Sequence, residues 1–130
     1  HPGGELGKRL LTTAADVMRT NDLPVIPQEM HLGEAIICVS KGQLGLGVSL
    51  GDDNKVIGLI TDGDIRRALT ANGANTLSKT AQELMTSHPK TIHQDTYLSE
   101  AENYMKAHKI HSLVVVDDAQ NVVGLVEFSS

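Results

Sequence analysis

The sequence predicts an α/β fold of the α+β type, in which two pseudo-symmetric βαββα units pack their sheets together. The first observation behind this prediction is an internal repeat, since residues 15–26 resemble residues 81–92 and residues 32–60 resemble residues 98–126. We place the one extra residue of the first copy within 27–31. The second observation is size, because units of roughly 60 residues bury little surface alone and should share a core.

The first copy has the pattern of a helix, an extended segment, a second helix, two strands and a closing helix. The second helix is amphipathic, with apolar residues at positions i, i+3, i+4 and i+7, and the two strands flank the polar turn GDDN. Asn72-Gly73 should stop the closing helix. The expected elements are a helix over 14–18, an extended piece over 24–26, a helix over 32–39, strands over 44–50 and 55–61, and a helix over 64–71.

The second copy repeats this order without a closing helix. Its expected elements are a helix over 81–85, an extended piece over 90–92, a helix carrying Leu98, Ala101 and Met105, and strands over 112–116 and 122–126. Residues 71–80 (ANGANTLSKT) read as the connection between the copies. We therefore expect a first domain over 13–73, a linker over 74–80 and a second domain over 81–130, preceded by a tail over 1–12.

The composition disfavours several classes of protein. The chain is 40% hydrophobic but only 2% aromatic, so its core must consist of aliphatic side chains and methionine. A net charge of −5 without a basic run disfavours nucleic-acid binding, and no apolar stretch has the length of a membrane span. The single Cys38 cannot form an internal disulfide, which is typical of a cytoplasmic protein. Because the chain opens with His1, we expect it to be a fragment of a longer protein.

The order of elements, together with the stretch VIGLITDGDIRRAL (56–69), resembles a tandem pair of CBS domains over residues 13–130. The leader HPGGELGKRLL (1–11) resembles the end of the sugar isomerase (SIS) domain of arabinose 5-phosphate isomerases, which run directly into a CBS pair. This resemblance implies a regulatory CBS pair that belongs to a sugar-phosphate isomerase.

The parent protein implied by this resemblance interconverts D-ribulose 5-phosphate and D-arabinose 5-phosphate. That reaction feeds Kdo, the acidic sugar of bacterial lipopolysaccharide or capsule. The resemblance also implies that His1 assists proton transfer in the parent's active site. The 130 residues offer no acid–base constellation of their own, so the chain itself should be inactive. We further expect the CBS pair to dimerise, the parent to be a tetramer, and the SIS domain to be a partner.

Gly58, Thr61 and Asp64 fit the CBS nucleotide pattern G-x-x-[ST]-x-x-[DN]. The resemblance implies that Asp64 accepts hydrogen bonds from ribose hydroxyls and that Thr61 lies nearer the phosphate. Gly58 would let the backbone come close to the ligand, and the free N–H groups at the helix start favour an anion. The expected ligand is an adenine nucleotide or a cytidine nucleotide-sugar, and no other cofactor is expected.

Asp62, Arg66 and Arg67 complete the predicted ligand site. Cations in the first turn of a helix oppose its dipole, so a bound anion would explain the two arginines, although the nearby aspartates could suffice. The alternative is that Asp62 or Asp64 is only a helix cap, a role worth about 1 kcal/mol. The two interpretations remain open from the sequence alone.

The second copy departs from the nucleotide pattern. Glu127 stands where Thr61 stands in the first copy, and Ser130 stands where Asp64 does. A carboxylate at the phosphate-facing position would repel an anion. We therefore expect the second site to be degenerate and ligand binding, if present, to be asymmetric.

Other motifs give weaker signals. His108 and His111 are spaced like metal ligands, but further ligands are not evident, so no metal site is expected. The glycines of GQLGLG (42–47) are better interpreted as structural, with Gly42 as a helix C-cap. The competing function for the whole chain is a purely structural oligomerisation module that binds no ligand.

Overall fold

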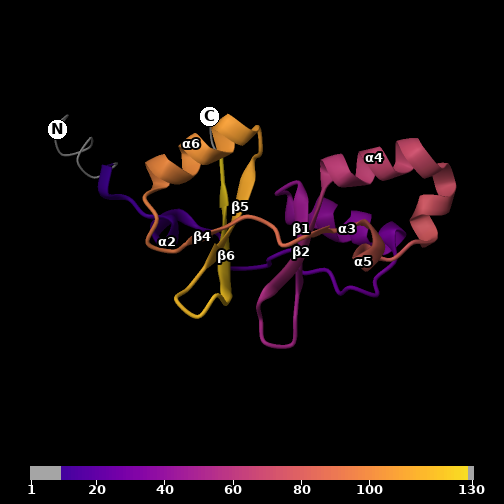
Figure 1. The fold of residues 1–130 in the computed structure, drawn as a ribbon, viewed down its shortest axis with the longest axis horizontal. Helices are drawn as coiled ribbons and strands as arrows, with labels where there is room; N and C mark the ends of the chain where they lie inside the picture. The colour runs from indigo at the N-terminus through magenta and orange to yellow at the C-terminus, as the bar shows by residue number, and fades with distance from the viewer. Residues whose placement is uncertain (1–9, 129–130) are drawn as a thin grey trace. The chain divides into compact units, whose positions relative to one another are not determined.

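The structure, a computed structural model, describes residues 10–128, which divide into two compact units (Figure 1). Unit 2 is the continuous stretch Asp22–Pro89, whereas the described part of unit 1 combines residues 10–21 with residues 90–128. Each unit contains one three-stranded sheet and one cluster of buried apolar side chains. The leading helix of each sequence repeat therefore packs in the unit that the other repeat builds.

Unit 2 contains a sheet in the order β1-β2-β3, in which neighbouring strands are antiparallel. The expected extended piece before the first long helix contributes only an isolated parallel bridge, between Val25 and Val48. The elements in chain order are α3 (Leu32–Gly42), β1 (Leu46–Leu50), β2 (Val56–Thr61), α4 (Asp62–Asn72), the 3-10 helix η1 (Gly73–Ser78), α5 (Ala81–Leu84) and β3 (Thr86–Ser87).

Unit 1 contains a sheet in the order β4-β5-β6, in which β4 is parallel to β5 and β6 is antiparallel to it. Arg19 forms an antiparallel bridge to Leu125, at the edge where unit 2 has β3. The elements are α2 (Ala14–Val17), β4 (Thr91–His93), α6 (Leu98–His108), β5 (Ser112–Val116) and β6 (Val122–Glu127). The prediction of an α/β fold built from two repeated units is confirmed.

The buried side chains follow the predicted apolar faces. Leu32, Ala35 and Val39 form the buried face of α3, at the spacing that one side of a helix requires. In α6 the same face buries Ala101 and Met105. Strand β5 is buried along its whole length, as expected of a strand that lies between two others and is covered on both faces.

Each leading helix begins at an alanine that is fully buried in its host unit. Ala14 belongs to the buried cluster of unit 1 and Ala81 to that of unit 2. The backbone fixes both helices in the same way, because the N–H of Ala14 donates to Thr96 O at 2.8 Å and that of Ala81 donates to Met30 O at 2.7 Å. The exchange of leading helices is therefore symmetric between the units.

A methionine after each leading helix lies over a glycine in the last long strand of its unit. A Cβ atom at Gly58 would collide with the Met85 sulfur, and its distance to Met85 Cγ would be 2.8 Å. A Cβ atom at Gly124 would lie 2.7 Å from the Met18 sulfur and 2.8 Å from Arg19 O. Both glycines are therefore required by close packing of the exchanged segments.

The position predicted for the extra residue of the first copy is wrong. Ala14 and Ala81 occupy equivalent places, and so do Asp22 and His88, both of which have left-handed backbone conformations. The first copy uses one residue more than the second between these two points. The extra residue thus lies ahead of Asp22 and not within 27–31, because the two copies already align without a gap from Asp22 and His88 onward.

Two helix ends also differ from the predictions. Gln43, with φ 60°, takes the left-handed position that ends α3, so Gly42 is its last helical residue and not its cap. The reason for Gly42 is packing, since a Cβ atom there would lie 2.8 Å from Pro24 Cβ. Helix α4 begins at Asp62, two residues earlier than predicted, and η1 occupies much of the expected connection over 71–80.

The longest described helices, α3, α4 and α6, have 11 residues each. Across residues 10–128, none combines the length and hydrophobicity needed to cross a bilayer.

Candidate functional site

The predicted ligand site lies at the turn where β2 ends and α4 begins. Thr61 is the N-cap of α4, and its Oγ1 accepts a hydrogen bond from the N–H of Asp64 at 3.1 Å. The N–H of Thr61 in turn donates to Asp64 Oδ2 at 3.0 Å. This reciprocal capping box forms because the two residues are three positions apart at the start of a helix. It holds a hydroxyl and a carboxylate next to each other.

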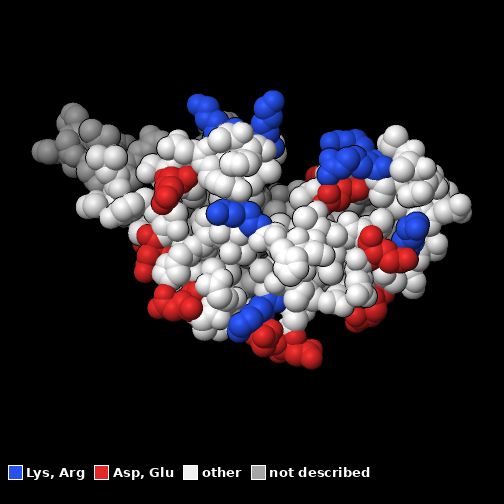
Figure 2. All heavy atoms as spheres, in the orientation of Figure 1, with Lys and Arg blue, Asp and Glu red and all other residues white. Residues whose placement is uncertain are grey.

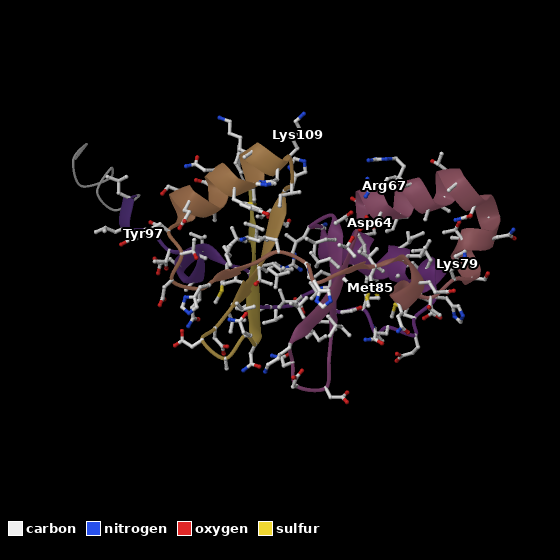
Figure 3. All side chains as sticks on the ribbon, viewed as in Figure 1. Asp64, Arg67, Lys79, Met85, Tyr97 and Lys109 are labelled. Atoms are coloured by element: carbon white, nitrogen blue, oxygen red, sulfur yellow. The ribbon has the colours of Figure 1, made fainter. Side chains whose placement is uncertain are left out.

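Arg67 pairs with the remaining oxygen of the Asp64 carboxylate. Its Nη2 lies 2.7 Å from Asp64 Oδ1, one helical turn along α4. Figure 2 shows basic and acidic atoms together over the start of α4, where Figure 3 labels both side chains. The Asp64 side chain is only 16% exposed, whereas that of Arg67 is 71% exposed. The carboxylate is therefore held in place, and the guanidinium can move into solvent.

The sequence predicted that the two arginines lie in the first turn of α4, and this prediction is wrong. Because α4 begins at Asp62, Arg66 and Arg67 fall in its second turn, where the helix dipole has less effect. Arg67 also has a protein partner in Asp64. Within the described residues, Arg66 is exposed and forms no ion pair. The argument that both cations need a bound anion is therefore weakened.

Packing explains the glycine at position 58 without any bound ligand. It faces Met85, whose side chain fills the space that a Cβ atom would take. The glycine in the equivalent position of the second copy, Gly124, has the same role against Met18. The presence of this glycine in both copies is explained by the exchanged segments alone.

Asp62 lines a pocket of about 350 Å³, which lies between the end of α3 and the start of α4. The predicted site residues are thus divided, since Asp62 is in the pocket lining while Thr61, Asp64 and Arg67 are not. The sequence reasoning missed the other lining residues, because the pocket depends on the left-handed turn at Gln43 and on helix packing. They are Ile36, Val39, Ser40, Gln43, Gly45 and Ile65.

In the second copy, the equivalent turn has the same backbone hydrogen bond, but it has Glu127 in place of the Thr61 hydroxyl. The N–H of Phe128 donates to His111 O at 2.8 Å, as the N–H of Asp62 donates to Gly45 O at 2.9 Å. Glu127 is exposed. Ser130, the counterpart of Asp64, lies outside the described residues, as does His1. The degenerate second site stays a prediction.

His108, the last residue of α6, has a local role. The ring of His108 stacks on Tyr104 with centroids 4.0 Å apart, and its Nδ1 lies 3.0 Å from Tyr104 O. The ammonium of Lys90 lies over the same tyrosine ring. Within residues 10–128, no three His, Cys, Asp or Glu side chains come together as a metal site would require.

Comparison with known proteins agrees with this architecture. The chain matches the CBS domain family over residues 14–71 and again over residues 81–129. The CBS domain pair of protein MJ0100, solved in complex with 5′-methylthioadenosine and S-adenosyl-L-methionine, superposes with a TM-score of 0.76 at 27% sequence identity. The superposition covers 90% of each chain.

Two curated relatives are similar over nearly the whole chain. The probable arabinose 5-phosphate isomerase of Haemophilus influenzae is 56% identical over 130 residues, which is 100% of this chain. Arabinose 5-phosphate isomerase KpsF of Escherichia coli is 40% identical over 126 residues, or 97% of this chain. The match spans 38% of the length of each relative. The chain therefore belongs to the CBS domain family, as a tandem pair homologous to the CBS region of arabinose 5-phosphate isomerases.

Proposed function

We propose that this chain is the regulatory CBS pair of an arabinose 5-phosphate isomerase. The 56% identity to the Haemophilus influenzae relative over all 130 residues supports this assignment. Because the match spans only 38% of that relative, the isomerase domain would lie in the rest of the parent protein. The parent would interconvert D-ribulose 5-phosphate and D-arabinose 5-phosphate for the synthesis of Kdo. His1 would act in that domain's active site, and the 130 residues alone would show no turnover.

The regulatory ligand would bind at the turn formed by Thr61 and Asp64. The observation that supports this most directly is the capping box, which leaves two groups available. Thr61 Oγ1 accepts its bond from a backbone N–H, so its hydroxyl proton remains free to donate to a phosphate oxygen. Asp64 Oδ1 pairs with the exposed Arg67 and can accept from a ribose hydroxyl when that arginine turns toward the phosphate.

An adenosine-containing ligand is supported by the 27% identical CBS pair of protein MJ0100, which holds 5′-methylthioadenosine and S-adenosyl-L-methionine. The two arginines of α4 add a preference for a phosphate group. AMP is therefore the first probe, and a cytidine nucleotide-sugar is the second. Dimerisation of the pair and a tetrameric parent remain part of the proposal.

A second candidate function is a purely structural module. The observation in its favour is that Thr61, Asp64 and Arg67 satisfy one another without any ligand. In that case the charge at the turn would only cap and stabilise α4. The capping box would then be worth about 1 kcal/mol, the usual contribution of a helix cap.

A thermal-unfolding experiment with AMP separates these functions. AMP at 100 times its dissociation constant should stabilise the chain by about 2.7 kcal/mol. Asp64→Ala should remove this stabilisation while lowering the stability of the free protein by only about 1 kcal/mol. Asp16→Ala is the matched control, because Asp16 Oδ2 accepts from the N–H of Thr13 in the capping box of α2. It should destabilise the protein similarly and leave the AMP effect intact.

The role of Arg67 gives a second readout of the same experiment. Arg67→Ala should weaken the binding of AMP much more than the binding of adenosine, because only AMP offers the phosphate that the guanidinium would bind. If neither AMP nor a cytidine nucleotide-sugar changes the unfolding curve of the unmodified chain, the ligand proposal is wrong and the structural function is supported.

A further inference from the structure

The long helices of the two units differ in the chemistry of their exposed residues. In α3 of unit 2, Ile37 is 56% exposed and the neighbouring Ile36 is half-buried. The equivalent residues of α6 in unit 1 are the polar Glu102 and Asn103. Both helices have 11 residues and bury the same face toward their units. The exposed isoleucine of α3 is therefore not required by the fold that the two units share.

The pocket of about 350 Å³ lies beside this isoleucine pair. Ile36 belongs to its lining, together with the buried Val39 and Ile65, so three aliphatic side chains contribute to its wall. Unit 1 has charged or titratable residues at most of the equivalent positions. Glu102, Lys106, Lys109 and His111 stand there in place of Ile36, Ser40, Gln43 and Gly45. An apolar hollow next to an exposed isoleucine is typical of an interaction surface, and only unit 2 has it within residues 10–128.

Helix α4 adds two opposite charges beside this pocket. Asp62 lines the pocket, and Arg66 follows one helical turn later. Both side chains are exposed, and neither forms an ion pair with any residue in 10–128, whereas Asp64 and Arg67 pair with each other. Residues four positions apart lie on the same face of a helix. One face of α4 thus presents a carboxylate and a guanidinium that are both available to a partner.

We propose that this part of unit 2 is the surface through which two copies of the chain associate. We refer to it as the unit 2 patch, which consists of Ile36, Ile37, Asp62 and Arg66. The inference rests on the proposed function, which includes dimerisation, and assigns that dimerisation to one surface. A two-fold axis brings the same surface of both copies together, so the surface must be complementary to itself. Antiparallel packing of the two α4 helices would place Asp62 of each copy opposite Arg66 of the other.

The apolar residues decide which unit forms the interface. Ile36 and Ile37 contribute the apolar area that the centre of a stable interface needs. The equivalent surface of unit 1 lacks aliphatic residues at these two positions, and its Lys106 and Lys109 outnumber Glu102. Two copies of that surface would bury little apolar area and would bring like charges together. The dimer is therefore held through unit 2 and not through unit 1.

Sedimentation equilibrium of the 130-residue chain tests the proposal by measuring the dissociation constant of the dimer. Ile37→Lys should raise this constant about tenfold or more, because the interface loses an apolar contact and gains a charge. Asn103→Lys is the matched control, since it introduces the same side chain at the equivalent exposed position of α6. It should leave the constant unchanged. A chain that stays monomeric at micromolar concentration would overturn the proposal, and so would equal weakening by the two variants.

Two charge reversals test the pairing across the two-fold axis. Asp62→Lys and Arg66→Glu should each raise the dissociation constant about tenfold or more, because like charges then face each other. A mixture of the two variants should associate nearly as tightly as the unmodified chain, since both contacts across the axis then join opposite charges. A local effect of either substitution on folding would not be reversed by mixing. Failure of the mixture to associate would therefore contradict the pairing of Asp62 with Arg66.

Binding of AMP keeps this inference separate from the proposed ligand function. A chain that AMP stabilises but that remains monomeric would refute the unit 2 patch and leave the ligand function intact. A chain whose association depends on the patch, but which neither AMP nor a cytidine nucleotide-sugar stabilises, would support the patch and contradict the ligand function.

Discussion

The two units share one backbone plan and differ most at the turn after the last long strand. In unit 2 the turn carries the Thr61–Asp64 capping box, followed by an 11-residue helix. In unit 1 the turn carries Glu127 and Phe128, yet the backbone bond from Phe128 to His111 matches the one from Asp62 to Gly45. The fold therefore does not depend on the capping box. The side chains at this turn can therefore differ between the two units without a change of fold.

A second difference concerns the end of the long helix. In unit 2, Gly42 lies directly against Pro24. In unit 1 the equivalent contact involves large polar side chains, since Lys90 and His108 both lie against the ring of Tyr104. The end of the long helix thus packs closely against a proline in unit 2 and carries a stacked cluster of side chains in unit 1. The two units therefore do not need the same packing at this helix end.

The largest expected effect on stability comes from replacing the glycines in the two methionine–glycine contacts, which should differ in cost between the units. Gly124→Ala should destabilise the protein by about 2–3 kcal/mol, because the new Cβ would press on Arg19 O as well as on Met18. Gly58→Ala should cost about 1–2 kcal/mol, because only the flexible Met85 side chain must move. Urea unfolding measures both values. Equal costs at the two sites would contradict the distinction between a backbone and a side-chain neighbour.

An intermediate effect sharpens the comparison of the two turns. Thr61→Ala should lower the unfolding free energy by about 1 kcal/mol, because the N–H of Asp64 loses its acceptor at the start of α4. Glu127→Ala, at the equivalent position, should change stability by less than about 0.5 kcal/mol, because that side chain is exposed. Thermal denaturation of the two variants is the measurement. A comparable loss at Glu127 would show that the second turn is also stabilised by its side chain.

The smallest expected effect concerns acid stability. Hydrogen bonds from the backbone N–H and hydroxyl of Thr80 lower the pKa of Glu83 below its ordinary value of 4.5. The folded-state pKa is the lower one, so this stabilisation is present above pH 4.5 and is lost as the pH falls through the folded-state pKa. Glu83→Gln should therefore lose stability relative to the unmodified protein at pH 7 and approach it in acid.

Denaturant unfolding between pH 7 and pH 3 tests this dependence, with Glu29→Gln as the control because Glu29 is also an exposed carboxylate in unit 2. A pH-independent difference between the Glu83 variant and the unmodified protein would show that the capping box acts through geometry and not through ionisation.

The sequence was sufficient to predict elements that are long or strongly patterned. The helices starting at Leu32 and Leu98 follow from their apolar spacing, and the strand over 112–116 agrees with the structure at both ends. The exchange of leading helices could not be predicted in this way. Helices of four residues, such as α2 and α5, complete barely one turn, so their buried alanines carry no periodic signal.

The candidate site shows the same division. Thr61 and Asp64 could be predicted as neighbours because residues three apart at a helix start face each other. Pairing of Arg67 with a nearby aspartate stayed open beside a bound anion, because the helix was expected to begin at Asp64, two residues later than it does. The packing role of Gly58 was also hidden, since Met85 comes from the other repeat and no local pattern links the two.

The exchange of leading helices has a consequence for synthesis on the ribosome. Unit 2 is one uninterrupted stretch, so it can complete its contacts as soon as residue 89 has emerged. Helix α2 is made first among the described elements, yet its partners in residues 90–128 are made last. A nascent chain that stalls after residue 89 would carry a folded unit 2 and an unpaired α2 with its apolar side uncovered. Unit 1, which contains the earlier-made α2, is therefore the last to finish folding, and α2 stays without its partners until residues 90–128 have been made.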